Sequence, residues 1–207
     1  MSKVRIAVLV SGGGTNLQAL IDAKDAGMLK SGEIALVVSS NENAYALQRA
    51  KKHGIPTVVV SKKACENQAE FEHKIHASLL GQGIQLVVLA GFMSILSADF
   101  VAKWPKRVIN VHPSLIPAFC GEGYYGLKVH KAVLAYGVKL TGATVHFVNE
   151  IPDGGEIIMQ KSIPVLKHDT PEALQRRVME RAEWQLLPRA AELVSSNILK
   201  EGESYGS

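Results

Sequence analysis

Apolar runs alternate with helical patterns along the first half of the chain. The segment 4–10 is almost continuously apolar and stops at a glycine-rich loop, and apolar positions then recur with helical spacing over 16–21. Strands that are buried on both faces are typical of parallel sheets, so this succession predicts βα units of an α/β fold. It returns three times, with strands expected over 34–38, 57–60 and 86–90 and helices over 44–53, 70–80 and 98–104.

The pattern changes after a fifth expected strand over 108–111. A long loop rich in proline and glycine covers 113–126, and a helix is expected around 129–136. The strand-like segments 143–148 and 157–160 are joined by a connection too short for a helical crossover, so they should pair antiparallel. We therefore predict a mostly parallel, twisted sheet of about seven strands with flanking helices, a Rossmann-like N-terminal half and an antiparallel strand pair near the C-terminal end.

The last expected element is a helix from Pro171 to about Val194. Asp169 and Thr170 form its capping start, and Pro188 should kink or split it. Because no repeat or linker divides the chain, we expect a single domain over 1–200 and a flexible tail over 201–207.

Composition narrows the class of protein. Hydrophobic residues make up 47% and charged residues 20% of the chain, which is typical of a folded globular protein and not of a disordered one. Cys65 and Cys120 lack metal or disulfide spacing, and no segment has the pattern of a membrane span or signal peptide, so we expect a cytoplasmic protein without a membrane partner. The net charge of +4 is spread over short pairs, which favours a small anionic substrate and not a nucleic acid.

The glycine-rich loop after the first strand is a candidate anion site. Backbone amides and a helix dipole meet there. Leu17 stands where a dinucleotide fingerprint has its third glycine, and the loop also lacks the Lys-Ser/Thr pair of a Walker motif. We predict a phosphomonoester seat formed by Gly14, Thr15 and Asn16, with an ordinary tight turn as the alternative.

Asn110 and His112 end the fifth strand and should share one face of the sheet at its ligand-binding edge. A carboxamide beside an imidazole suits direct acyl transfer, because the amide stabilises an oxyanion while the imidazole moves a proton. Asp153 lies in the connection between the last two strands and could act on the imidazole, although Asp-Gly is also a common hairpin turn.

Other histidines carry weaker signals. Glu72, His73 and His76 do not match a metal motif and are interpreted as a solvated helix face. His146 lies among apolar neighbours, and its context leaves open a core role and a role beside the site. No metal is expected.

Five segments together carry a family resemblance. SGGGTNLQAL, LAGFMSIL, NVHPSLIPAF, GATVHFV and DGGEIIMQ occur in this order and resemble the folate-dependent glycinamide ribonucleotide formyltransferases of de novo purine (IMP) biosynthesis. The resemblance spans Val4 to about Pro188. It implies a formyltransferase domain, a monomer or homodimer, that moves the formyl group of 10-formyltetrahydrofolate to the amine of 5′-phosphoribosylglycinamide, with the folate as cosubstrate and without a metal.

The resemblance also implies roles for site residues. Asn110, His112 and Asp153 would be the catalytic trio: Asn110 and protonated His112 stabilise the oxyanion, and Asp153 keeps His112 protonated. The folate would contact Met93, Ser94, Ile95, Leu96, Asn110, Asn149, Glu150, Ile151, Pro152 and Asp153. The ribonucleotide would contact Gly12, Gly13, Gly14, Thr15, Asn16 and Glu183.

The chain departs from many relatives at three places. Gln68 stands where an arginine is frequent, the segment 119–126 is longer and could cover the substrates, and Trp184 replaces a common histidine. The alternatives that remain are a formyltetrahydrofolate hydrolase, a formyltransferase for another amine, and a binding module without catalysis.

Overall fold

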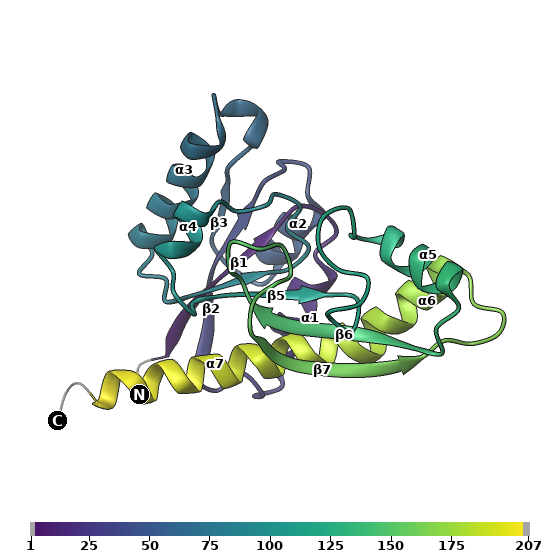
Figure 1. Ribbon diagram of the computed structural model, residues 1–207. Helices are drawn as coiled ribbons and strands as arrows, with labels where there is room; N and C mark the ends of the chain where they lie inside the picture. Colours follow the sequence, from purple (N-terminus) through teal and green to yellow (C-terminus); the bar gives the residue numbers. More distant parts are fainter. Residues whose placement is uncertain (1–2, 205–207) are drawn as a thin grey trace.

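The strands form one seven-stranded sheet in the order β3-β2-β1-β4-β5-β6-β7, flanked by helices (Figure 1). The computed structural model describes residues 3–204. The first five strands pair in parallel, and β6 and β7 continue the sheet antiparallel, which confirms the predicted α/β class. The strands are β1 Val4–Val10, β2 Gly32–Ser39, β3 Thr57–Val59, β4 Leu86–Leu89, β5 Val108–His112, β6 Leu140–Phe147 and β7 Ile157–Pro164. The helices are α1 Thr15–Asp25, α2 Tyr45–Lys52, η1 Lys62–Ala64, α3 Gln68–Gly81, α4 Ala98–Ala102, α5 Leu127–Tyr136, α6 Pro171–Val178, η2 Met179–Glu183 and α7 Trp184–Ser204.

Helices cover both faces of the sheet, which explains why its central strands are mostly apolar. In β1, Ile6 and Val8 belong to the core that also contains side chains of α1, α5, α6 and α7. Ala7 and Leu9 point to the opposite core, with α3 and α4. Figure 1 shows α3 and α4 on one side of the sheet and the long α7 on the other. The carboxyl ends of β1, β4 and β5 are thereby held at a common edge.

The C-terminal helix differs from the prediction. It divides into α6 and α7 at the π-helical turn η2, upstream of Pro188, and α7 continues through Pro188. A π turn widens a helix and is frequent at functional sites. The element also extends to Ser204, so residues 201–204 are helical and not a tail, while 205–207 lie outside the described residues. Within 3–204, no helix combines the length and apolar character needed to cross a membrane.

Several element boundaries also move. β6 begins at Leu140 and β7 ends at Pro164, because the two strands pair over their whole length. Exposed and half-exposed polar residues occupy much of β7, so the sequence did not predict its second half as a strand. α3 begins at Gln68, where the Asn67 side chain accepts a hydrogen bond from the Glu70 backbone and caps the helix.

Candidate active site

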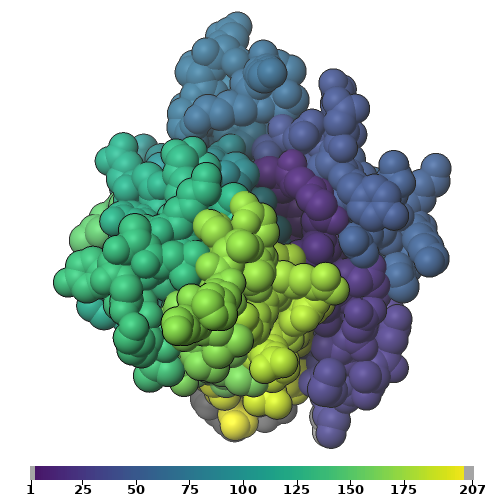
Figure 2. Space-filling model, turned by 90° about the vertical axis from the view of Figure 1, so that its right-hand side faces the viewer, coloured from purple at the N-terminus to yellow at the C-terminus, as the bar shows by residue number. Residues whose placement is uncertain are grey.

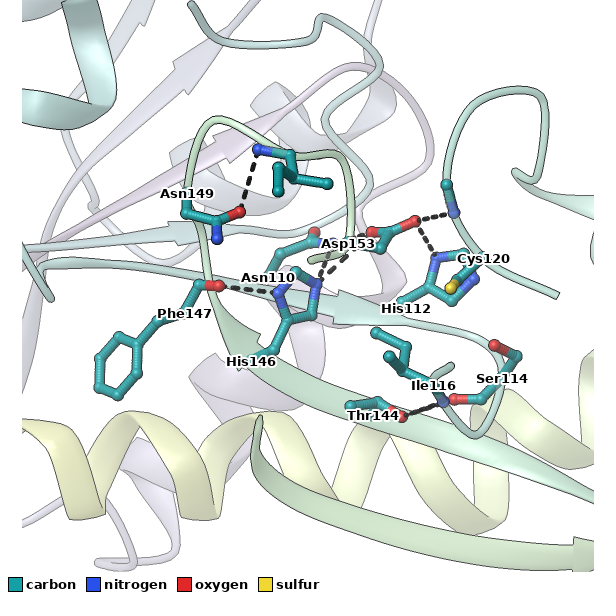
Figure 3. Close-up of polar contacts among 12 residues, drawn as sticks. Asn110, His112, Ser114, Ile116, Cys120, Thr144, His146, Phe147, Asn149 and Asp153 are labelled. Atoms are coloured by element: carbon teal, nitrogen blue, oxygen red, sulfur yellow. Dashed lines mark hydrogen bonds and ion pairs between the residues drawn. The ribbon is translucent and has the colours of Figure 1, made fainter. Parts of the chain in front are cut away.

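Asn110 and His112 lie at the carboxyl end of β5, two residues apart in one strand. The antiparallel register between β5 and β6 sets Asn110 opposite His146, and the Asn110 amide nitrogen is 3.3 Å from His146 Nε2. His146 Nδ1 donates to the Phe147 carbonyl oxygen at 2.8 Å, so its Nε2 faces Asn110 (Figure 3). His146 therefore belongs to the same cluster, and the pairing of the two strands was the signal for it.

Asp153 reaches these side chains from the loop between β6 and β7 (Figure 3). Its carboxylate lies 3.3 Å from His112 Nδ1 and 3.5 Å from His146 Nε2. The Asn110 amide nitrogen is 3.5 Å away, and the Gly121 backbone N–H donates to the carboxylate at 2.9 Å. The proximity of Asp153 to His112, which only the family resemblance implied, is present in the structure.

The backbone around Asp153 explains the two glycines after it. Asp153 itself has a left-handed backbone, with φ of 56°. A Cβ on Gly154 would lie 2.7 Å from the Ile151 side chain, and one on Gly155 would lie 1.7 Å from the Phe147 carbonyl oxygen. The Asp-Gly-Gly sequence is thus required for a tightly packed loop that presents a carboxylate to the site, beyond the needs of a hairpin turn.

Burial lowers the pKa of His112, and the charge of Asp153 and the hydrogen bond to the Phe119 carbonyl oxygen oppose this shift only in part. Both ring nitrogens of His112 face acceptors, Asp153 and the Phe119 carbonyl oxygen, so the carboxylate favours the imidazolium while burial favours the neutral ring. That Asp153 keeps His112 protonated stays a prediction. Burial acts to raise the pKa of Asp153, but His146, His112 and the Gly121 N–H together lower it.

One further histidine was missed by sequence reading. His130 in α5 is fully buried, and neither of its ring nitrogens has a hydrogen-bond partner among the described residues. Burial, assisted by the charge of His112, lowers the pKa of His130 to about 4. The helical spacing of α5 predicts only that residue 130 points inward, so the sequence did not distinguish His130 from a core residue.

These groups open onto one cavity of about 770 Å³. In Figure 2 the yellow-green C-terminal segment lies at the front, and the purple N-terminal segment is set back beside it. The cavity is lined by all ten residues expected to contact the folate, and by Asn16, His112 and Glu183. Gly12, Gly13, Gly14 and Thr15 are not among its lining residues.

The predicted folate segment, residues 93–96, is held from behind by α3. Glu72 is buried and accepts hydrogen bonds from the Ser97 backbone N–H at 2.6 Å, from the Ser97 hydroxyl and from Gln68 Nε2 at 2.6 Å. Gln68 Nε2 also donates to the Ile95 carbonyl oxygen at 3.0 Å. The segment interpreted as a solvated helix face is exposed at His73 and half-buried at His76. It is buried at Glu72, whose side chain supports the loop that lines the cavity.

We expect Glu72→Gln to raise the KM for the folate about tenfold, because an amide cannot accept all three hydrogen bonds of the carboxylate. The KM for the ribonucleotide should stay unchanged. Glu70→Gln on the same helix is the control, since Glu70 does not line the cavity and its contacts are a surface ion pair with Lys74 and a hydrogen bond from the Glu66 backbone N–H. Steady-state kinetics with each substrate varied in turn measures the difference, and equal effects on both KM values would contradict this role.

The glycine-rich loop has one position that demands glycine. Gly14 has a positive φ of 71°, and a Cβ there would lie 2.6 Å from the Ala46 Cβ. Added Cβ atoms on Gly12 and Gly13 would meet nothing within 4 Å. Arg49 Nε donates to the Gly13 carbonyl oxygen at 2.9 Å, so a guanidinium that sequence reading missed shapes this loop.

Gly14→Ala should therefore lower the stability of the protein by about 2 kcal/mol, and Tm by about 4–8 °C, while Gly13→Ala leaves both unchanged. The strained backbone conformation and the contact with Ala46 are the causes. Thermal unfolding followed by circular dichroism measures the two variants. A Gly14→Ala protein that unfolds at the wild-type temperature would show that this loop is not held as described.

Asn16 and Glu183, expected to contact the ribonucleotide, are brought together from opposite ends of the chain. Asn16 Nδ2 donates to Glu183 Oε2 at 2.8 Å, and both side chains are buried. Burial raises the pKa of Glu183, and the hydrogen bond from Asn16 opposes this. Glu183 ends the π turn η2, so the irregular helix orients this carboxyl. The Asn16 oxygen is left without a hydrogen-bond partner among the described residues.

A second hollow of about 840 Å³ lies between α1 and α7. Thr15 and Trp184 line it, and none of Asn110, His112 and Asp153 does. The described residues contain no group of three or more histidine, cysteine or acidic side chains placed to hold a metal ion.

Known proteins share this sequence and architecture. The chain is 44% identical over 203 residues to the trifunctional purine biosynthetic protein adenosine-3 of Gallus gallus, covering 98% of this chain and 20% of that protein. It is 38% identical over 176 residues to the chloroplastic phosphoribosylglycinamide formyltransferase of Arabidopsis thaliana, covering 84% of this chain and 60% of that one. The chain thus spans about a fifth of the length of the trifunctional relatives.

A solved structure agrees with both the fold and the sequence. Glycinamide ribonucleotide transformylase 1 from Symbiobacterium toebii superposes with a TM-score of 0.88 at 38% identity, over 94% of this chain and 89% of that chain. The formyl transferase family matches residues 4–191, a stretch that contains the whole sheet and the cluster at its edge. With the sheet, the cluster and this match in agreement, the chain belongs to the formyl transferase family.

Proposed function

We propose that this chain transfers the formyl group of 10-formyltetrahydrofolate to the amine of 5′-phosphoribosylglycinamide, which yields the formylated ribonucleotide and tetrahydrofolate in de novo purine biosynthesis. One observation carries the proposal: Asn110, His112 and Asp153 converge in a cavity that is lined by the residues expected to contact the folate and by Asn16 and Glu183 of the expected ribonucleotide site. The names of two relatives support the ribonucleotide as the acceptor of the formyl group.

The amine attacks the formyl carbon, and its lone pair forms the new C–N bond while the carbonyl oxygen becomes an oxyanion. Asn110 donates its amide hydrogen to that oxygen, since its present contacts of 3.3 and 3.5 Å are long and easily exchanged. Neutral His112 takes the proton of the attacking amine, and Asp153 stabilises the imidazolium that results. The carbonyl re-forms as the bond to the folate nitrogen breaks, and the imidazolium of His112 returns its proton to that nitrogen.

The two substrates occupy opposite sides of the cavity. Met93, Ile95 and Ile151 are apolar and each more than half exposed, a surface suited to one face of a flat pterin ring. Asn16 and Glu183 offer an amide oxygen and a carboxyl to the ribose hydroxyls. The phosphate lies toward the glycine-rich loop and the start of α1, where the helix dipole favours an anion.

Loss of the formyl group can be followed by ultraviolet absorbance when the purified protein meets 10-formyltetrahydrofolate. We expect deformylation only when the ribonucleotide is present. Steady deformylation without it would instead establish a hydrolase. A different amine that supports faster turnover would identify another acceptor.

The setting of the reaction is part of the proposal. Cys65 and Cys120 are both free thiols, as in a reducing compartment, and we place the protein in the cytoplasm. It acts on small molecules as a monomer or homodimer. Sedimentation at several protein concentrations distinguishes these two states.

A further inference from the structure

The cavity is acidic, although both proposed substrates are anions. Its lining carries the carboxyl groups of Glu122, Glu150, Asp153 and Glu183. Among the described residues that line it, Lys128 is the only lysine or arginine. Phosphoribosylglycinamide carries a phosphate, and the folate carries glutamate carboxylates. A cation is needed at this surface, because the carboxylates otherwise repel either substrate.

Lys128 is held in place without being neutralised. Its Nζ donates to the Tyr125 hydroxyl at 2.8 Å and lies 4.3 Å from the centre of the Tyr125 ring. No carboxylate among residues 3–204 lies within ion-pair distance of Lys128. A cation over an aromatic ring keeps its charge available to a ligand. Most exposed lysines move freely, but this one is oriented in advance, which reduces the entropy lost when it binds an anion.

The segment that carries Tyr125 is itself tied to the reacting groups. The Gly121 backbone N–H donates to Asp153, and every residue over 121–126 lines the cavity. Lys128 follows this segment in the first turn of α5, two residues before the buried His130. The segment thus brings Tyr125 to Lys128 at the cavity.

We propose that Lys128 binds an oxyanion of a substrate, either the ribonucleotide phosphate or a glutamate carboxylate of the folate, and that Tyr125 positions it. The inference rests on the proposed function and adds a specificity-determining residue to it. Lysine acts here as a point charge and so accepts either oxyanion. If Lys128 binds the phosphate, removing its charge weakens the binding of the ribonucleotide. If it binds the glutamate carboxylate, the same change weakens the binding of the folate.

Lys128→Gln tests the proposal, with Lys131→Gln as the matched control on the same helix, because Lys131 is exposed and does not line the cavity. We expect the KM for one substrate to rise about tenfold in Lys128→Gln, with kcat within about twofold, and no change in Lys131→Gln. An increase for the ribonucleotide assigns the phosphate, and an increase for the folate assigns the glutamate. Unchanged KM values for both substrates would overturn the proposal.

Truncated substrates show whether the loss in Lys128→Gln comes from the missing contact with an oxyanion or from a general disturbance of the structure. Glycinamide riboside lacks the phosphate, and 10-formyltetrahydropteroate lacks the glutamate. The loss in Lys128→Gln should vanish with the analogue that lacks the bound oxyanion, and a loss that persists with both analogues would overturn the role. Tyr125→Phe, which keeps the ring and removes the hydroxyl, should weaken the same substrate about threefold.

Calorimetric titration of each substrate separates this inference from the proposed reaction. If the wild-type protein binds both substrates but does not turn them over, the proposed function fails. Lys128 is still tested in that case, because Lys128→Gln must weaken the binding of one substrate. Equal affinities in Lys128→Gln and the wild type would overturn the inference whatever the outcome for catalysis.

Discussion

His112→Ala should lower kcat/KM for formyl transfer at least about 10³-fold, because it removes the imidazole that lies beside Asp153 and is proposed to take the proton of the attacking amine. The ribonucleotide should bind with nearly unchanged affinity, since Asn16, Glu183 and the glycine-rich loop are untouched. Steady-state kinetics and calorimetric titration of the ribonucleotide measure the two effects separately.

His73→Ala is the control for this variant, because His73 is exposed on α3. Circular dichroism establishes that His112→Ala is folded before its activity is interpreted, since His112 is buried. Turnover within tenfold of the wild type would remove His112 from the reaction.

Asp153→Asn should lower kcat at least about 10²-fold, because an amide cannot stabilise the imidazolium of His112. Asparagine is a suitable replacement, since it tolerates the left-handed backbone conformation of residue 153 better than most side chains. The fold should therefore be retained, with the same Tm. A variant with wild-type kcat would contradict the account of this carboxylate.

The same substitution gives a signed prediction for pH. The charge of Asp153 raises the pKa of His112, while burial lowers it by more. Removing the charge should thus lower the His112 pKa further. His112 is neutral above its pKa, so the acid limb of kcat/KM should fall at a lower pH in Asp153→Asn than in the wild type. Nuclear magnetic resonance titration of the His112 ring measures the pKa directly, and a rise would contradict the assignment.

Much of the fold could be predicted because its signals are local. Apolar runs such as 4–10 that end in a glycine loop are typical of parallel strands, and the short connection before Ile157 excluded a crossover. The C-terminal helix was less predictable. The π turn before Trp184 packs against β6 and β7, and the sequence does not show these contacts. Pro188 is visible in the sequence and predicts a break, but α7 continues through it.

The site was predictable where strand alternation or family resemblance applied, as for Asn110 and His112. Glu72 could not be found, since its hydrogen bonds to Ser97 span 25 residues and the helix pattern alone marks it as a polar position. The protonation state of His112 could not be decided from the sequence either. Its pKa depends on burial by the surrounding chain, and a nearby carboxylate alone does not decide it.

In the proposed reaction, one cavity joins the formyl donor to the amine at Asn110, His112 and Asp153. The most direct measurement uses 10-formyltetrahydrofolate with a ¹³C-labelled formyl group and follows the label by nuclear magnetic resonance in the presence of phosphoribosylglycinamide. We expect the label to move to the formamide of the ribonucleotide, and not to move with His112→Ala. Label that appears as free formate, or that stays on the folate with the wild-type protein, would contradict the proposed reaction.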